Sequence, residues 1–224
     1  MFTGIIEAVG SVKSVENKQG DLKLRIHTAG LDLSDVKLGD SIATNGVCLT
    51  VVELPGDGFV ADVSRESIAH TWIDRWSSGT KVNLEKAMTP STRMGGHIVT
   101  GHVDGVGTIK KRSADARSIR FTVSAPDHLK KYIAAKGSIT VDGVSLTAND
   151  LGSEGFELNI VPHTASETTL IDLKVGSPVH LEVDIIARYL EQLLTSGNAG
   201  KETDSSAANS GLSQAFLMQN GFWK

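Results

Sequence analysis

The chain has only one cysteine, Cys48, among its 224 residues, so it cannot form an intramolecular disulfide bond. A zinc site would have to be built from the 7 histidines and the carboxylates. The sequence also lacks any run of about 18 apolar residues. Its first residues contain no basic region followed by an apolar stretch. We therefore expect a cytoplasmic protein in a reducing compartment.

Aromatic residues and positive charge are scarce as well. Aromatics make up 5% of the chain, and the formal net charge is −4. Such a composition supplies neither the stacking platforms nor the basic surface that nucleic-acid binding requires, so we expect a small-molecule ligand. Only 5 prolines accompany 23 glycines and 40% hydrophobic residues, which indicates a folded, turn-rich protein of two domains, each of roughly 100 residues.

An internal repeat organises the chain at a spacing of 97 residues, without a gap from the N-terminus to about Met88. The unit is longer than the 20–50 residues typical of solenoid repeats, so each copy is expected to fold as a closed domain. The clearest matching segments are Thr3-Gly4 with Thr100-Gly101, 46–50 with 143–147, and 82–85 with 179–182.

Apolar and polar residues alternate within each copy, as they do in half-buried strands; Leu22, Leu24 and Ile26 are an example. About six strands per copy must hide their edges, which favours a small closed barrel. The boundary between copies is expected near 90–96, where proline and glycines interrupt regular structure. Further strands are expected at 5–12, 41–52, 58–63 and 81–85, and short helices at 66–76 and 125–135.

The pattern changes after the second copy. From Asp184 to Thr195 the apolar residues fall on one face of a helix. The pattern leaves two alternatives open: this face docks on the chain's own barrel, or it packs against copies of itself. Residues 197–211 are small and polar and predict a flexible linker, whereas 212–224 form an apolar tail.

Four motifs stand at fixed spacing: Met1-Phe2-Thr3-Gly4-Ile5, Asn45-Gly46-Val47-Cys48-Leu49-Thr50-Val51, Gly95-Gly96-His97 followed by Gly101-His102-Val103-Asp104, and Asp142-Gly143-Val144-Ser145-Leu146-Thr147. Together they resemble the riboflavin synthase family. The likeness covers roughly residues 1–190; Thr100 stands where serine is common, and the tail after about Ser196 is expected to have no family counterpart.

The resemblance implies an all-β fold with short helices: two tandem six-stranded closed Greek-key barrels plus a C-terminal helix, assembled as a homotrimer. The implied parts are a lumazine-binding barrel at 1–96, a second at 97–187, an oligomerisation helix at 184–196, and the linker and tail at 197–224. The implied activity is that of a transferase. It dismutates two molecules of 6,7-dimethyl-8-ribityllumazine by four-carbon transfer, giving riboflavin and 5-amino-6-ribitylaminopyrimidinedione. No metal or cofactor is implied, and lumazine synthase is the implied protein partner.

A dismutation uses one substrate in two roles. We therefore expect residues shared by the two copies to bind the common ligand, and residues that differ to distinguish donor from acceptor. The differing pairs include Cys48 with Ser145, Glu66 with His163, Ile5 with His102, Asp62 with Asn159, and Gly39 with Lys136.

The resemblance assigns catalytic roles to His102, Ser41, Cys48 and His97, with histidine as the proton carrier. Each has a structural alternative: Cys48 as a small buried hydrophobe, and the histidines as turn residues. Glu66 beside Arg65 could form a surface ion pair. The implied substrate contacts are Phe2, Gly4, Ile5, Ile6, Cys48, Leu49, Thr50, Asp62, Val63, Ser64, Arg65, Glu66, Ser67, Gly101, His102, Val103, Lys136, Asp142, Ser145, Leu146, Thr147, Ile160, Val161, Pro162, His163, Thr164 and Ala165.

Two other functions compete with the enzyme. The first is a non-catalytic lumazine- or flavin-binding antenna protein of the same fold. The second is a barrel that transports a ligand or binds oligonucleotides. The enzyme is favoured because both copies keep the Leu-Thr motif, at Leu49-Thr50 and Leu146-Thr147, and because the candidate catalytic residues are all present.

Overall fold

The computed structural model describes residues 1–196, so the linker and apolar tail expected at 197–224 lie outside the described residues. Met1–Ile185 form one compact unit, and a second begins at Ile186. Helix α4 (Ile185–Ser196) carries the expected apolar face, and Leu193 is 72% exposed. None of the helices in 1–196 is long and apolar enough to cross a membrane.

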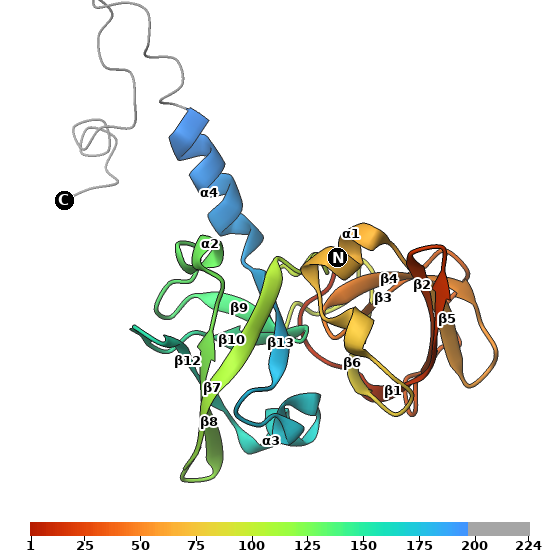
Figure 1. The fold of residues 1–224 in the computed structure, drawn as a ribbon, viewed down its shortest axis with the longest axis horizontal. Helices are drawn as coiled ribbons and strands as arrows, with labels where there is room; N and C mark the ends of the chain where they lie inside the picture. The colour runs from red at the N-terminus through yellow and green to blue at the C-terminus, as the bar shows by residue number, and fades with distance from the viewer. Residues whose placement is uncertain (197–224) are drawn as a thin grey trace, which may run out of the picture. The chain divides into compact units, whose positions relative to one another are not determined.

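The first repeat folds into a closed barrel of six strands, as predicted (Figure 1). Their order around the barrel is β1-β2-β5-β4-β3-β6, in which β2 lies beside β5 and thereby closes a Greek key. All neighbouring pairs are antiparallel. The strands are β1 (Ala8–Lys18), β2 (Asp21–His27), β3 (Ser41–Thr44), β4 (Val47–Glu53), β5 (Gly58–Val63) and β6 (Lys81–Lys86).

The second repeat uses the same order but is less clearly closed, because β10 and β11 stand at the two ends of its seven-stranded sheet. β10 is shorter than its counterpart β4, and the added β11 pairs only with β12. The Asn149 N–H still donates to the Glu157 carbonyl, 2.8 Å away, and so links the end of β10 to β12. The strands are β7 (Gly105–Asp115), β8 (Ser118–Ser124), β9 (Ser138–Val141), β10 (Val144–Thr147), β11 (Leu151–Gly152), β12 (Gly155–Ile160) and β13 (Pro178–Val183).

The stretch predicted as one strand at 41–52 is a hairpin. Asn45 and Gly46, at φ 46° and 80°, form its turn, and Asp142 and Gly143 repeat the turn at 47° and 80°. Two successive residues with positive φ are typical of the type I′ turn, whose twist matches that of the flanking strands. The first strand also differs from the prediction: it begins at Ala8, because the residues before it reach the second repeat, where the Ser145 N–H donates to the Gly4 carbonyl.

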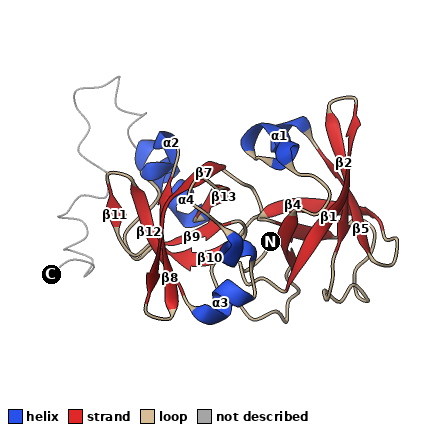
Figure 2. Ribbon diagram, turned by 60° about the horizontal axis from the view of Figure 1, so that its bottom comes forward, coloured by secondary structure: helices blue, strands red, loops and turns tan. Residues whose placement is uncertain are grey.

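A short helix follows β5 in the first repeat and β12 in the second (Figure 2). The predicted helix at 66–76 is divided into α1 (Arg65–His70) and the 3₁₀ turn η1 (Ile73–Arg75). The equivalent elements are α3 (Pro162–Ser166) and η2 (Thr169–Asp172). The helix predicted at 125–135 is only one turn long, α2 (Asp127–Lys130).

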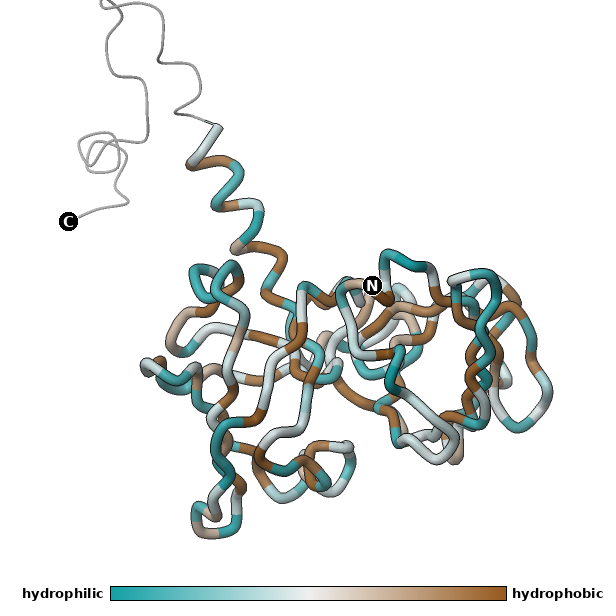
Figure 3. The backbone as a smooth tube through the Cα atoms, viewed as in Figure 1, coloured by the Kyte–Doolittle hydropathy of each residue, from teal (hydrophilic) through white to brown (hydrophobic). Residues whose placement is uncertain are grey.

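Each barrel has its own apolar core, and brown and teal residues alternate along the strands in Figure 3. In β4, for example, Leu49 is 2% exposed and points inward, whereas Cys48 and Thr50 lie on the outer face. Ser41 pairs with Thr50 across the hairpin and lies on the same outer face. The outer face therefore carries several predicted site residues.

Candidate functional site

The two repeats exchange the short arms that precede their first strands. The Cys48 N–H of the first barrel donates to the Gly101 carbonyl of the second repeat, at 2.8 Å. Symmetrically, the Ser145 N–H of the second barrel donates to the Gly4 carbonyl, also at 2.8 Å. Each barrel is thus completed by the arm of the other copy.

The apolar residues of the arms take part in the same exchange. Val103 packs against the core of the first barrel, and Ile6 packs against the core of the second. Phe2 and Val99 bridge the two arms where they cross, and both are buried. The predicted contacts at Gly4, Ile5 and Ile6 therefore belong to the second barrel, and those at 101–103 belong to the first.

A buried carboxylate holds each arm in place. Glu85 on β6 accepts hydrogen bonds from the Thr3 N–H and hydroxyl, both at 2.7 Å, and from the Gly4 N–H at 2.9 Å. Glu182 on β13 accepts the same three bonds from 100–101. Burial raises the pKa of both carboxyls, and the three hydrogen bonds oppose that effect. Sequence reasoning missed both residues, although the glutamate recurs at the repeat spacing.

A pocket of about 250 Å³ lies on the outer face of the first barrel, where the arm of the second repeat meets α1. It brings together six predicted residues: Cys48, Glu66, Ser67, Gly101, His102 and Val103. It adds three that were not predicted: Val47, His70 and Thr71. Cys48 comes from β4, whereas His102 comes from the other repeat, so the constellation depends on the arm exchange.

The pocket has the groups needed for proton transfer and for binding hydroxyls. Cys48 is a free, partly buried thiol. The His102 side chain is exposed. The backbone N–H of His102 donates to the Thr100 hydroxyl at 3.3 Å, which fixes the backbone of the arm. Glu66 and His70 form a pair at 3.1 Å. Among residues 1–196, no three His, Cys, Asp or Glu side chains are placed to bind a metal ion.

His97 lies in the second barrel, apart from His102. Its Nδ1 is 2.7 Å from the hydroxyl of Ser145, the counterpart of Cys48. Desolvation lowers the pKa of His97, while the nearby Asp184 acts in the opposite direction. Within the described residues its buried Nε2 has no hydrogen-bond partner. The two predicted catalytic histidines therefore serve different barrels.

Several predicted contacts lie elsewhere. Asp142 is fully buried between the barrels and does not line the first pocket, and the Arg65 guanidinium turns away to the Gln19 carbonyl. Lys136, with φ 65°, lies near Asn149 at 3.4 Å. Five others are buried: Phe2, Leu49, Val63, Ile160 and Ala165. The remaining contacts are on strands or helix ends of the two barrels: Ser41, Thr50, Asp62, Ser64, Leu146, Thr147, Val161, Pro162, His163 and Thr164.

A buried polar network joins the two hairpin turns. The Asn83 N–H donates to Asn45 Oδ1 at 2.7 Å, and its Nδ2 donates to the Asp142 carbonyl at 2.9 Å. In the other direction, the His180 N–H donates to Asp142 Oδ1 at 2.8 Å, and its Nδ1 donates to the Asn45 carbonyl at 2.9 Å. The network is symmetric in its bonds although the residues differ.

The same two side chains anchor the segments that follow α1 and α3. Asn83 Oδ1 accepts from the Thr169 N–H at 2.8 Å, and His180 Nε2 accepts from the Trp72 N–H at 3.1 Å. Since its Nε2 accepts and its Nδ1 donates, His180 is neutral. Burial lowers the pKa of His180 to about 4 and raises the pKa of Asp142 to about 7. The helix beside each barrel is therefore tied to the opposite barrel.

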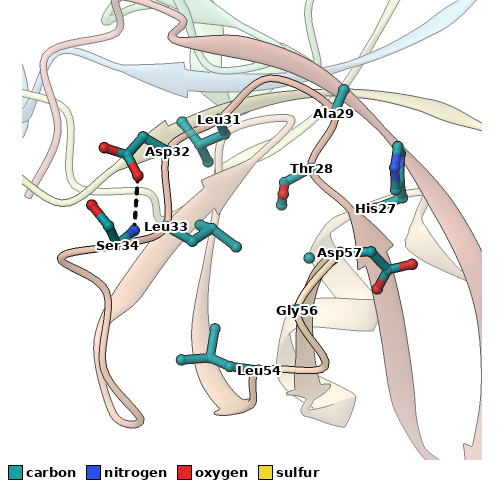
Figure 4. A pocket seen from close by; sticks show the side chains of 11 residues that line it. His27, Thr28, Ala29, Leu31, Asp32, Leu33, Ser34, Leu54, Gly56 and Asp57 are labelled. Carbon is teal, nitrogen blue, oxygen red and sulfur yellow. Dashed lines mark hydrogen bonds between the residues drawn. The ribbon is translucent and has the colours of Figure 1, made fainter.

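Another hollow, of about 430 Å³, lies at the opposite end of β5 in the first barrel (Figure 4). It contains none of the predicted site residues. Its carboxylates already have partners: Asp57 pairs with Arg25 at 3.1 Å, and Asp32 accepts from the Ser34 N–H at 2.9 Å. The pocket beside α1 is therefore the better candidate site.

Comparisons with known proteins identify both repeats. The lumazine-binding domain matches residues 3–87 and again 100–184. The chain is 49% identical to the riboflavin synthase of Photobacterium phosphoreum over 222 residues, which is 99% of both chains. The tail after Ser196 therefore does have a counterpart in this relative, contrary to the expectation from the motifs. It is 39% identical to the riboflavin synthase of Bacillus subtilis (strain 168) over 222 residues, covering 99% of this chain and 100% of that protein.

Solved structures share the architecture. The crystal structure of LumP complexed with riboflavin matches with a TM-score of 0.76 and 26% identity, over 82% of this chain and 99% of that one. LumP complexed with 6,7-dimethyl-8-(1'-D-ribityl) lumazine matches with a TM-score of 0.74 at the same identity and coverage. The identity to the two riboflavin synthases is higher than the identity to LumP and extends over nearly the whole chain. The chain belongs to the riboflavin synthase family.

Proposed function

We propose that this protein is a riboflavin synthase, which dismutates two molecules of 6,7-dimethyl-8-ribityllumazine into riboflavin and 5-amino-6-ribitylaminopyrimidinedione. The observation that carries the proposal is the duplicated lumazine-binding domain, in which each copy completes the other. One substrate molecule gives a four-carbon unit and the other accepts it. The atoms of the two substrates equal those of the two products, so the reaction needs no oxidant or reductant.

The two barrels differ where the reaction requires different roles. The first places Cys48 beside Gly101 and His102, and the second places Ser145 beside Gly4 and His97. In the proposal, His102 carries the proton removed from the 7-methyl group of one lumazine. In the proposal, the Cys48 thiol contacts the ligand, and so do the hydroxyls of Ser41 and Thr50, which share its outer face but lie outside the pocket lining.

Holding both substrates together supplies much of the rate. In the proposal the first barrel of one subunit faces the second barrel of a neighbour in a trimer, and the exposed apolar face of α4 supports such self-association. Fixing two reactants in one orientation removes about 7–11 kcal/mol of barrier in favourable cases. The proposed domains are 1–96 and 97–187, with 184–196 as the oligomerisation helix, in a cytoplasmic enzyme that has lumazine synthase as a partner.

A direct assay tests the function. The purified protein is mixed with 6,7-dimethyl-8-ribityllumazine alone, and absorbance and fluorescence are followed. We expect one riboflavin for every two lumazines consumed. Tight binding without turnover would instead support a non-catalytic antenna protein, the alternative that the likeness to ligand-bound LumP favours.

A variant tests the proton carrier. His102→Ala is expected to lower kcat by about 10²–10⁴-fold, the usual contribution of a positioned acid or base. Because His102 is exposed, the fold should be unchanged by circular dichroism. Undiminished turnover in this variant would contradict the role of His102 while leaving the overall reaction intact.

A further inference from the structure

Helix α1 places an acid and a base together at the mouth of the first pocket. Glu66 and His70 are four residues apart, so they lie on the same helical face. Both line the pocket, and His70 Nε2 is 3.1 Å from Glu66 Oε1. His70 is not among the site residues that the family resemblance implies.

The backbone of α1 is fixed, whereas these two side chains are not. The Ser64 hydroxyl accepts from the Ser67 N–H at 3.3 Å, and the Thr71 hydroxyl donates to the Ser67 carbonyl at 2.6 Å. By contrast, the Glu66 side chain is 84% exposed and that of His70 is 55% exposed. The bond between them is therefore what restricts the direction of the Glu66 carboxylate.

The second barrel has the same residue types in reversed order. His163 stands at the position equivalent to Glu66, and Glu167 at that of His70. Within residues 1–196 no hydrogen bond joins their side chains, and Glu167 Oε1 instead accepts from the Ser166 hydroxyl at 3.2 Å. The acid–base pair is therefore a property of the first pocket only.

We propose that His70 is a positioning residue that orients Glu66 to accept hydrogen bonds from the hydroxyl groups of the bound ligand's polyhydroxylated chain. The inference rests on the proposed function, in which a ribityllumazine occupies this pocket. A carboxylate only accepts hydrogen bonds, so it suits a chain of hydroxyl donors. With one oxygen held by His70, the other is directed to the ligand. The imidazole of His163 lacks the two acceptor oxygens of a carboxylate. The two pockets therefore bind the hydroxyl groups of the ligand differently.

The test compares His70→Ala, Glu66→Gln and the double variant. We expect His70→Ala to raise KM for 6,7-dimethyl-8-ribityllumazine about three- to tenfold, the range for loss of one hydrogen bond, with kcat within about twofold. Because His70 acts through Glu66, the double variant should be no worse than Glu66→Gln alone. His70→Gln should recover most of the loss, since its amide is also a donor. A fluorescence titration with riboflavin should show the same order.

Glu167→Ala provides the matched control, because it changes the equivalent position of the second barrel and should leave KM within about twofold. An unchanged KM in His70→Ala, additive losses in the double variant, or a fall in kcat alone would overturn the role of His70. If His70→Ala melts at a lower temperature, the other two single variants test the role of His70. The role is supported if His70→Gln restores KM while Glu66→Gln raises it, and it is overturned if both variants have the KM of the unaltered protein. Failure of the unaltered protein to bind lumazine would contradict the proposed function instead.

Discussion

At the scale of single residues, two substitutions between the repeats preserve a buried network while changing its chemistry. Asn83 in the first copy becomes His180 in the second, and Asn45 becomes Asp142. An imidazole and an amide each offer one donor and one acceptor at a suitable separation. A protonated Asp142, with its pKa raised to about 7, is as neutral as Asn45. The network therefore tolerates the exchange because all four groups remain uncharged near pH 6.

The two ionisable members should affect stability in opposite ways as pH changes. Folding lowers the pKa of His180 from 6.5 to about 4, so in that range the unfolded chain binds more protons and stability rises with pH. Folding raises the pKa of Asp142 from 3.8 to about 7, so stability from this group is complete at low pH and is lost as pH rises to about 7. Between pH 4 and 6.5 the two contributions oppose each other.

Replacing Asp142 or His180 by the asparagine found in the first repeat should leave only the pH dependence of the other residue. Relative to the unaltered protein, Asp142→Asn should gain free energy of unfolding as pH rises from 4.5 to 6.5, and His180→Asn should lose it. Each difference should reach about 3 kcal/mol over these two pH units, because one unit corresponds to about 1.4 kcal/mol for a single proton. Urea unfolding at several pH values, followed by tryptophan fluorescence, measures this. Three parallel pH profiles would show that neither group changes its pKa on folding.

At the scale of elements, the exchanged arms complete the site, because each arm supplies residues to the opposite barrel. Glu182 holds the arm that supplies Gly101 and His102 to the first pocket. Glu85 holds the arm that supplies Gly4 to the second barrel. A barrel strand is held by a continuous ladder of backbone bonds, whereas each arm has only isolated backbone bonds and adds three hydrogen bonds to one glutamate.

Removing one carboxylate should therefore damage one pocket selectively. Glu182→Gln places an amide NH₂ against donors of the arm, so we expect a loss of about 1–3 kcal/mol in the free energy of unfolding. Ligand titration by calorimetry should show loss of the site in the first barrel, and Glu85→Gln should remove the other.

Glu53→Gln is the control for these two variants, because Glu53 forms an exposed pair with Lys23 that contributes little to stability. It should retain both sites and the stability of the unaltered chain. Equal weakening of both sites by Glu182→Gln would mean that the arms do not act independently.

At the scale of the whole molecule, the two barrels meet through their hairpin turns. A Cβ on Gly143 would lie 2.7 Å from the backbone nitrogen of Gly46, and a Cβ on Gly46 would lie 2.8 Å from that of Gly143. Both glycines also have φ of 80°. Glycine is therefore required twice over, for the turn and for the close approach.

Gly143→Ala should consequently reduce the free energy of unfolding by more than about 2 kcal/mol, since it combines backbone strain with a clash against fixed backbone. Gly79→Ala separates the two effects: Gly79 has φ of 91°, but no atom lies within 4 Å of its added Cβ. It should cost only about 1 kcal/mol. Urea unfolding of the full chain provides the comparison, and equal losses would show that the turns do not press on each other.

Much of the fold followed from patterns along the chain. The spacing of 97 residues predicted two similar domains, and alternating apolar residues predicted their strands. The Asn45-Gly46 turn lay within the stretch 41–52 that was predicted as strand, because its neighbours are apolar. The separation of His97 from His102 was not predicted, since it depends on which barrel each arm reaches.

The sequence by itself determined that two homologous barrels would form, because alternation and turn residues act locally and the repeat applies them twice. Only the tertiary structure decided which residues share a pocket. Nothing local pairs Glu182 with Thr100 or Cys48 with Gly101, since these contacts join segments that are far apart in the chain. The arms cross at the Phe2–Val99 bridge, and the exchange brings His102 to Cys48.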